Sequence, residues 1–197
     1  MLQSIRFFLR NVIQKYYYYL NLIILKKNKV FFSYDFIIHG KIYVSNMGSI
    51  KIGKQFKANS GKHYNPIGGD IILRLICLNG AELKIGDNCG ISNSTIVCQK
   101  QIVIGNNVKI GGSVKIWDTD FHSTNPTKRA SAFDDDIKSA PILIKDNAFI
   151  GGAAIILKGV IIGANSIVAA GSIITKNIPD NEIWGGNPAR FIKKNES

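Results

Sequence analysis

The polar segment from residue 117 to residue 141 holds the side chains best suited to chemistry. It opens with "WDTDFH", which places His122 just after two acids, Asp118 and Asp120. A neutral imidazole can accept a hydroxyl proton, and a nearby carboxylate can orient the ring. The alternatives are an exposed loop histidine and solvated loop acids. Because the segment lacks aliphatic residues at the spacing of its flanks, we expect an external loop that places His122 at a cleft.

The sequence on both sides of this segment repeats an aliphatic residue at every sixth position. Before the segment the period runs to Ile116, and after it from Ile144 to Ile174. The fifth position of each hexad is small or β-branched, and the second is often Gly. A period of six fits neither an α-helix nor simple alternation, but it fits short parallel strands joined by tight turns. We therefore expect a parallel β-helix over residues 36–178.

The N-terminal segment, residues 1–35, is strongly basic. Up to residue 34 it carries six Lys or Arg residues and no acid, which is half of the net charge of +12. Its apolar stretch is too short to span a membrane, and no secretory cleavage site follows it. Apolar residues at helical spacing predict an amphipathic helix that docks on an anionic membrane or packs on its own domain or a partner subunit. These residues are Leu2, Ile5, Leu9, Val12, Tyr16 and Leu20.

The remaining composition excludes several classes of protein. Three cysteines, Cys77, Cys89 and Cys98, form an odd count without a CxxC pair, so we expect reduced core cysteines rather than a disulfide framework or a structural zinc site. The basic charge alone would suit nucleic acid, but no base-stacking or groove-reading motif accompanies it, so we expect no nucleic-acid partner.

Three features together resemble the hexapeptide-repeat (left-handed β-helix) acyltransferases, of the sugar and polysaccharide O-acetyltransferase type. They are the hexads from Ile85 to Ile178, the "DTDFH" loop, and the C-terminal "IVAAGSIITKNIPDNEIWGGNPARFIKK". The resemblance implies an all-β, left-handed parallel β-helix with an N-terminal helix, an external catalytic loop and a short tail at residues 179–197 that contributes to coenzyme A binding. It also implies acetyl-CoA as the donor, no metal, and a homotrimer with each active site between two subunits.

The same resemblance assigns roles to individual residues. His122 matches the catalytic base, with Asp120 or Asp118 to orient it, and Asn93 in "SNSTIV" matches an acceptor-binding asparagine. A thioester is already activated, so one base can suffice. An alternative interpretation of the cations in the C-terminal tail is a basic terminus that increases solubility. The cofactor-binding residues implied are Gly152, whose N–H would hold the oxyanion, and Ala170, Thr175, Lys176, Arg190 and Lys193.

The expected function is acetyl transfer to a hydroxyl of a sugar in a cell-envelope polysaccharide or its precursor. It would take place in the cytoplasm, or on the inner face of the plasma membrane if the N-terminal helix docks there. One alternative is an N-acetyltransferase that acts on an amino sugar carried by a nucleotide. A less favoured one is a zinc carbonic anhydrase of the same fold, which needs three converging histidines. The chain has only His39, His63 and His122.

Overall fold

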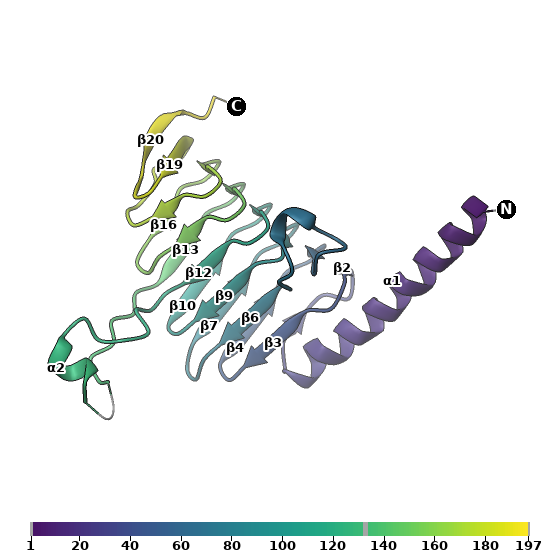
Figure 1. Ribbon diagram of the computed structural model, residues 1–197, viewed down its shortest axis with the longest axis horizontal. Helices are drawn as coiled ribbons and strands as arrows, with labels where there is room; N and C mark the ends of the chain where they lie inside the picture. Colours follow the sequence, from purple (N-terminus) through teal and green to yellow (C-terminus); the bar gives the residue numbers. More distant parts are fainter. Residues whose placement is uncertain (1, 132–133, 197) are drawn as a thin grey trace.

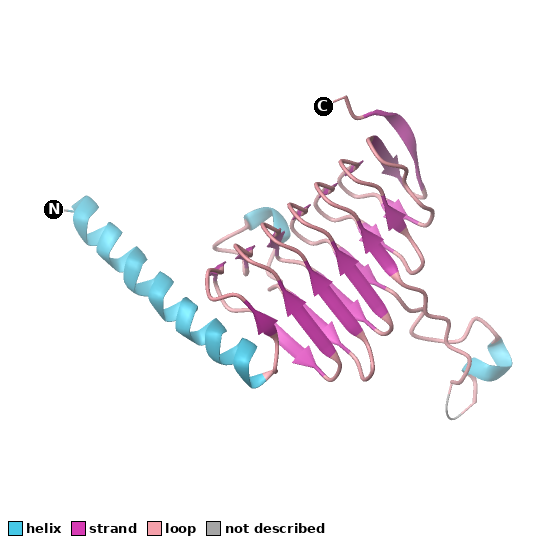
Figure 2. Cartoon of the chain, turned by 180° about the vertical axis from the view of Figure 1, so that it is seen from behind, coloured by secondary structure: helices cyan, strands magenta, loops and turns pink. Residues whose placement is uncertain are grey.

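The chain forms one long helix followed by a triangular coil of short strands (Figures 1 and 2). The computed structural model describes residues 2–131 and 134–196. Helix α1 (Leu2–Lys27) precedes the coil, and successive strands then belong to three sheets in turn, which we name sheets A, B and C. The named strands of the described residues pair in parallel, except that β19 and β20 pair with each other in the antiparallel sense. The expected left-handed parallel β-helix with an N-terminal helix is confirmed.

Each sheet collects every third strand of the coil. Sheet A contains β1 (Phe31–Phe32), β4 (Ser49–Ile52), β7 (Glu82–Ile85), β10 (Gln101–Ile104), β13 (Ile142–Ile144) and β16 (Ile161–Ile162). Sheet B contains β2 (Ile37–His39), β5 (Lys57–Asn59), β8 (Gly90–Ser92), β11 (Lys109–Ile110), β14 (Phe149–Ile150), β17 (Ile167–Val168), β19 (Glu182–Gly186) and β20 (Ala189–Lys194). Sheet C contains β3 (Tyr43–Asn46), β6 (Arg74–Cys77), β9 (Thr95–Cys98), β12 (Lys115–Trp117), β15 (Ile155–Ile156) and β18 (Ile173–Ile174).

The core consists of aliphatic columns that run along the inside of each sheet. In sheet A the register places Ile85 beside Ile104, Ile104 beside Ile144, and Ile144 beside Ile162. Each of these side chains is at most 1% exposed, so the six-residue period is the spacing of inward positions. The small fifth positions also point inward. All three cysteines are buried and unpaired, as expected.

Two insertions leave the coil at different corners, where one sheet passes into the next. Residues 60–73 leave at the B–C corner, between β5 and β6, and contain the short helix η1 (Pro66–Gly68). Residues 118–141 leave at the C–A corner, between β12 and β13, and contain α2 (Pro126–Arg129). Figure 2 shows the second insertion projecting from the body. The external loop therefore begins one residue later than expected, because Trp117 still belongs to β12.

The two ends of the coil are finished in different ways. The C-terminal part of α1 lies on the first coil, where buried Asn21 donates to the Gly40 carbonyl and accepts from the Ile42 N–H. At the other end, β19 adds to sheet B in parallel and β20 returns antiparallel to it. The tail beyond Pro179 therefore forms a hairpin. Within residues 2–131 and 134–196, no helix is long and apolar enough to cross a membrane.

Substitutions of the neighbouring residues Ile161 and Ile162 can test which side chains point into the core. Ile162 is fully buried, whereas Ile161 is 38% exposed on the same strand. We expect Ile162→Ala to lower the free energy of unfolding by about 2–5 kcal/mol, because it removes buried methyl groups and leaves a cavity. The control variant Ile161→Ala should cost less than about 1 kcal/mol. Guanidinium denaturation measures both, and equal losses would contradict the assigned faces.

Candidate active site

The external loop stands on a short antiparallel stem. Residues 118–120 lie beside residues 138–140, and the Asp120 N–H donates to the Lys138 carbonyl at 3.0 Å. Above the stem, α2 is capped by Asn125, and Arg129 donates to the Ser123 carbonyl at 2.8 Å. These bonds give the loop its own framework, which holds His122 beyond the C–A corner.

His122 is paired with Asp134, at the other side of the loop. The imidazole Nδ1 lies 2.6 Å from Oδ2 of Asp134, whose Oδ1 accepts from the Ser123 N–H at 2.9 Å. The Ser123 N–H and the imidazole hold the pKa of the Asp134 carboxyl below its usual range, so this group is a carboxylate at neutral pH. A carboxylate only accepts hydrogen bonds, so Nδ1 must carry the proton. Nε2 then has a free lone pair.

That lone pair is accessible. The His122 side chain is 72% exposed, and Nε2 has no hydrogen-bond partner within the described parts of the chain. An imidazole oriented in this way can accept a proton from an incoming hydroxyl group. The arrangement needs a carboxylate 12 residues along the chain, which the spacing of "DTDFH" does not suggest. Asp134 opens the acidic run "DDD" of the loop, and that run was the available signal.

The expectation that Asp120 or Asp118 orients His122 is wrong. Asp120 forms an ion pair with Lys158 instead, at 2.7 Å from Nζ, which ties the stem to the turn after β15. Asp118 is fully buried and serves the preceding coil. Its carboxylate accepts three backbone N–H groups at 2.6–2.8 Å, those of Gln99, Lys100 and Gln101. Both acids therefore fix the base of the loop.

Asn93 has a structural role in this chain. Its side chain is fully buried, and its amide donates to the carbonyls of Asn65 at 2.9 Å and Gly69 at 3.3 Å. Its oxygen accepts from the Gly61 N–H at 2.9 Å. Asn93 thus holds the insertion of residues 60–73 on the B–C corner. A direct contact with an acceptor stays a prediction.

Corners A–B and B–C differ in how they satisfy backbone N–H groups. At the A–B corner, an Asp or Asn side chain of the next coil accepts the backbone N–H of the turn. The Asp87 N–H donates to Oδ1 of Asn106 at 2.9 Å, and the Asn106 N–H donates to Oδ1 of Asp146 at 2.7 Å. Gly152 and Ala170 hold the equivalent positions at the B–C corner. In the described part of the chain, neither N–H reaches a hydrogen-bond acceptor. Such N–H groups can bind a ligand's oxygen.

Gly152 and Ala170 are stacked closely. A Cβ on Gly151 would lie 2.6 Å from the Ala170 nitrogen, so a larger residue there would push the two coils apart. Arg190 is near the same corner, because it pairs with Gly185 at the end of β19. The structure therefore brings together three of the residues implied for the cofactor.

The other implied residues lie across sheet C. Thr175 and Lys176 follow β18, and His122 follows β12, so all three are at or beyond the C–A corner. Gly152 precedes β15, which pairs in parallel with β12. A single chain thus presents the candidate base on one edge of sheet C and the free N–H groups on the opposite edge. Lys193 lies farther along β20, opposite Ile183.

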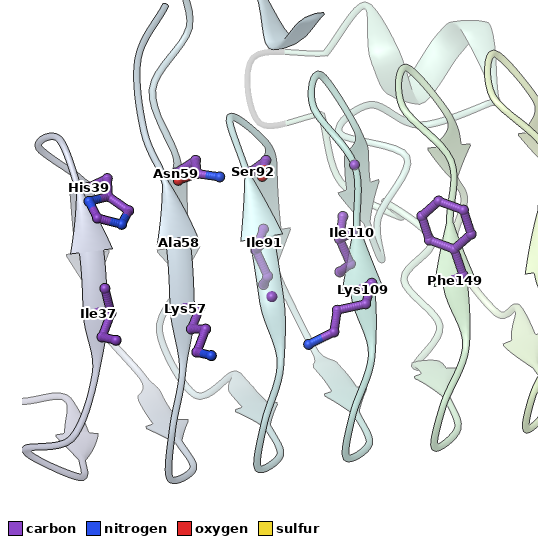
Figure 3. A pocket seen from close by; sticks show the side chains of 12 residues that line it. Ile37, His39, Lys57, Ala58, Asn59, Ile91, Ser92, Lys109, Ile110 and Phe149 are labelled. Carbon is purple, nitrogen blue, oxygen red and sulfur yellow. The ribbon is translucent and has the colours of Figure 1, made fainter. Parts of the chain in front are cut away.

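Two hollows lie outside this arrangement. A groove of about 490 Å³ follows the outer face of sheet B, where Gly90 lacks a side chain and Lys57, Lys109 and Phe149 form the sides (Figure 3). A second, of about 540 Å³, lies between α1 and residues 60–73 and includes His39 and His63.

The three histidines of the chain do not converge. His39 bonds to Gln14, with 2.5 Å between Nδ1 and Oε1, and shares its hollow with His63. His122 lies beyond a different corner. In the described ranges, no three His, Cys, Asp or Glu side chains are placed to hold a metal ion.

Several known proteins with similar sequences are acetyltransferases. Residues 141–176 match the family model "Hexapeptide repeat of succinyl-transferase". The chain is 36% identical to a candidate acetyltransferase of Saccharomyces cerevisiae, YJL218W, over 60% of this chain and 59% of that protein. It is 37% identical to galactoside O-acetyltransferase of Escherichia coli, over 58% and 55% of the two chains. The chain spans about half the length of the curated relatives that it matches first.

A third relative is matched over more of its length. A candidate lipopolysaccharide biosynthesis O-acetyl transferase of Escherichia coli, WbbJ, is 27% identical over 84% of this chain and 82% of that protein. Among solved structures, galactoside acetyltransferase in complex with coenzyme A is 28% identical, with a TM-score of 0.52 over 85% and 64% of the chains. The N-acyltransferase AntD from Bacillus cereus shares the fold, at 21% identity and a TM-score of 0.68 over 87% of each chain. The resemblance to hexapeptide-repeat acyltransferases is confirmed.

The structural role of Asn93 can be tested by limited proteolysis. Asn93→Ala removes three hydrogen bonds, so trypsin should cut after Lys62 at least about tenfold faster than in the natural protein. Asn88→Ala is the control, because both residues have positive φ and only Asn93 contacts residues 60–73. Equal cleavage rates in the two variants would show that Asn93 does not hold this insertion.

Proposed function

We propose that this protein is an acetyl-CoA-dependent O-acetyltransferase that modifies a sugar hydroxyl of a cell-envelope polysaccharide or its precursor, in the cytoplasm. The observation that carries the proposal is the His122–Asp134 pair, which leaves Nε2 accessible on a projecting loop. The similarity to named galactoside and lipopolysaccharide O-acetyltransferases supports the reaction class and the kind of acceptor.

The chemistry follows from the geometry of the pair. The acceptor hydroxyl gives its proton to Nε2 of His122 while its oxygen attacks the thioester carbonyl. Asp134 stabilises the imidazolium that forms, since its carboxylate already accepts the Nδ1 proton. The carbonyl oxygen becomes negative and is held by the N–H of Gly152. The tetrahedral intermediate then expels the coenzyme A thiolate, which takes the proton from Nε2.

This reaction requires two copies of the chain. The base and the N–H donors lie on opposite edges of sheet C, so one chain cannot present both to one acetyl group. In the proposed homotrimer, the C–A edge of one subunit faces the B–C edge of the next. His122 of one copy then meets Gly152 of its neighbour.

The donor would lie along the cleft between these edges. Ala170 offers a free N–H one coil beyond Gly152, where it can bind an amide oxygen of the pantetheine. Exposed Thr175 and Lys176 border the cleft from the other edge, and Arg190 and Lys193 supply charge for the phosphates.

The direct test is release of free thiol from acetyl-CoA in the presence of a panel of sugar acceptors. The proposal expects release with neutral saccharides or polysaccharide precursors and a product that loses its acetyl group in mild base, as an ester does. An N-acetyltransferase would use the same base and donor, but its product would resist mild base. Thiol release confined to amino sugars would contradict O-transfer, and no release with any acceptor would contradict the reaction class.

His122→Ala should lower kcat/KM by roughly 10²- to 10⁴-fold, because it removes the general base. Asp134→Asn should lower it by at least about tenfold, because the amide no longer fixes the Nδ1–H tautomer. Asn also tolerates the positive φ of this position. Asp120→Asn, in the same loop, is the control and should cost less than Asp134→Asn. The reverse order would restore Asp120 as the partner of His122.

Replacing both Lys176 and Arg190 by Gln should raise the KM for acetyl-CoA several-fold with little change in kcat, because their charges would act equally on the bound donor and the transition state. The matched control is Lys57→Gln with Lys84→Gln, which removes two exposed cations from other faces. If the KM stays unchanged in the first variant, these cations are surface charge only.

A further inference from the structure

Helix α1 has one face that packs on its own domain. Tyr18 stacks on Phe36 with ring centroids 4.9 Å apart, and Leu25 is 1% exposed. Gln14 and Asn21 bond to the first coil from the same side. The docked part therefore runs from about residue 14 to residue 27, and it covers the first coil, in agreement with the alternative that this helix packs on its own domain.

The opposite face of the helix is apolar and uncovered. Its residues recur at alternating intervals of three and four, which places them in one stripe along the helix. A rotation of 100° per residue puts this stripe about half a turn away from Tyr18 and Leu25. The members and their exposed fractions are Leu9 51%, Val12 48%, Tyr16 62%, Tyr19 61% and Ile23 63%. Phe8 at 66% and Ile13 at 47% widen the stripe on its two sides.

The N-terminal part of the helix extends away from the coil. Figure 1 shows α1 diverging from the coil, with its N-terminal end beyond the body. The helix contacts mainly β2 and β3, close to its docked part. Residues 6–13 are all exposed. An apolar stripe of this length is expected to have an occupant.

The charges beside the stripe are of one sign. By the same helical rotation, Arg6 borders the stripe on one side, with Arg10 next to it toward the docked face, and Lys15 and Lys26 border it on the other side. No Asp or Glu precedes Asp35 in the sequence. Pairing of this helix with its copies would bring cations against cations, without acids to match them. An anionic lipid surface complements the same pattern.

We propose that the outer face of α1 docks on an anionic lipid surface. The apolar stripe enters the boundary between head groups and acyl chains, and the flanking cations contact lipid phosphates. Tyr16 and Tyr19 suit this depth, because a tyrosine ring has an apolar body and a polar tip. The docked half of the helix joins this surface rigidly to the first coil, so the coil stands on the membrane by its N-terminal end.

Flotation of the full chain with vesicles tests the proposal, and the result does not depend on acetyl transfer. At low salt the protein should float with vesicles of mixed phosphatidylcholine and phosphatidylglycerol, and should not float with phosphatidylcholine alone. Replacing Arg6 and Arg10 by Gln should lower the partition coefficient about 25-fold, at about fivefold for each cation near an anionic leaflet. The control variant, Lys57→Gln with Lys84→Gln, should leave it nearly unchanged.

A second variant distinguishes the lipid surface from a second copy of the chain. Leu9→Gln with Val12→Gln should abolish flotation and leave the mass measured by light scattering unchanged. If this variant lowers the oligomer mass, the stripe is an interface between copies and the proposal fails. Absence of flotation with anionic vesicles at low salt, or equal losses in the charge variant and its control, would also overturn it.

Discussion

The register between successive coils is the constraint on which the rest of this structure depends. The inward aliphatic residues of one coil rest on those of the next, as Ile104 rests between Ile85 and Ile144. A strand that slipped by one residue would turn its inward side chain to solvent. The coil therefore accepts extra residues only at corners, where the chain changes sheet. Both large insertions leave there, one at the B–C corner and one at the C–A corner.

The three corners of the coil have different roles. At the A–B corner, Asp and Asn side chains close the turns by accepting the N–H groups of the coil before. At the B–C corner, Gly152 and Ala170 leave N–H groups open, and at the C–A corner a buried carboxylate, Asp118, anchors the loop that carries His122. The A–B corner thus stabilises the coil, whereas the B–C and C–A corners present the groups proposed to take part in the reaction. Sheet C keeps those groups apart within a chain.

The sequence predicts features that depend on neighbouring residues better than features that depend on residues far apart in the chain. The hexads repeat a local rule, so they predict the coil, its inward positions and the buried cysteines. The carboxylate that orients His122 depends on how the loop folds back, and Asp118, Asp120 and Asp134 are equivalent candidates until the stem and the Ser123–Asp134 contact exist. Asn93 could not be assigned from its neighbours, because its partners belong to an insertion about 30 residues earlier.

The two ends of the coil affect whether copies of the chain can stack end to end. A stack of parallel strands has no intrinsic last member, and an open end presents unpaired N–H and C=O groups to any other chain of the same pitch. Here α1 lies on the first coil, and β20 reverses direction, so the last strand of sheet B offers an antiparallel edge that carries Lys193 and Lys194. A second copy of the coil would have to add its strands in parallel, and the hydrogen-bonding groups on this edge of β20 do not match that pairing. On sheet B, the hairpin therefore disfavours end-to-end stacking of copies into fibres.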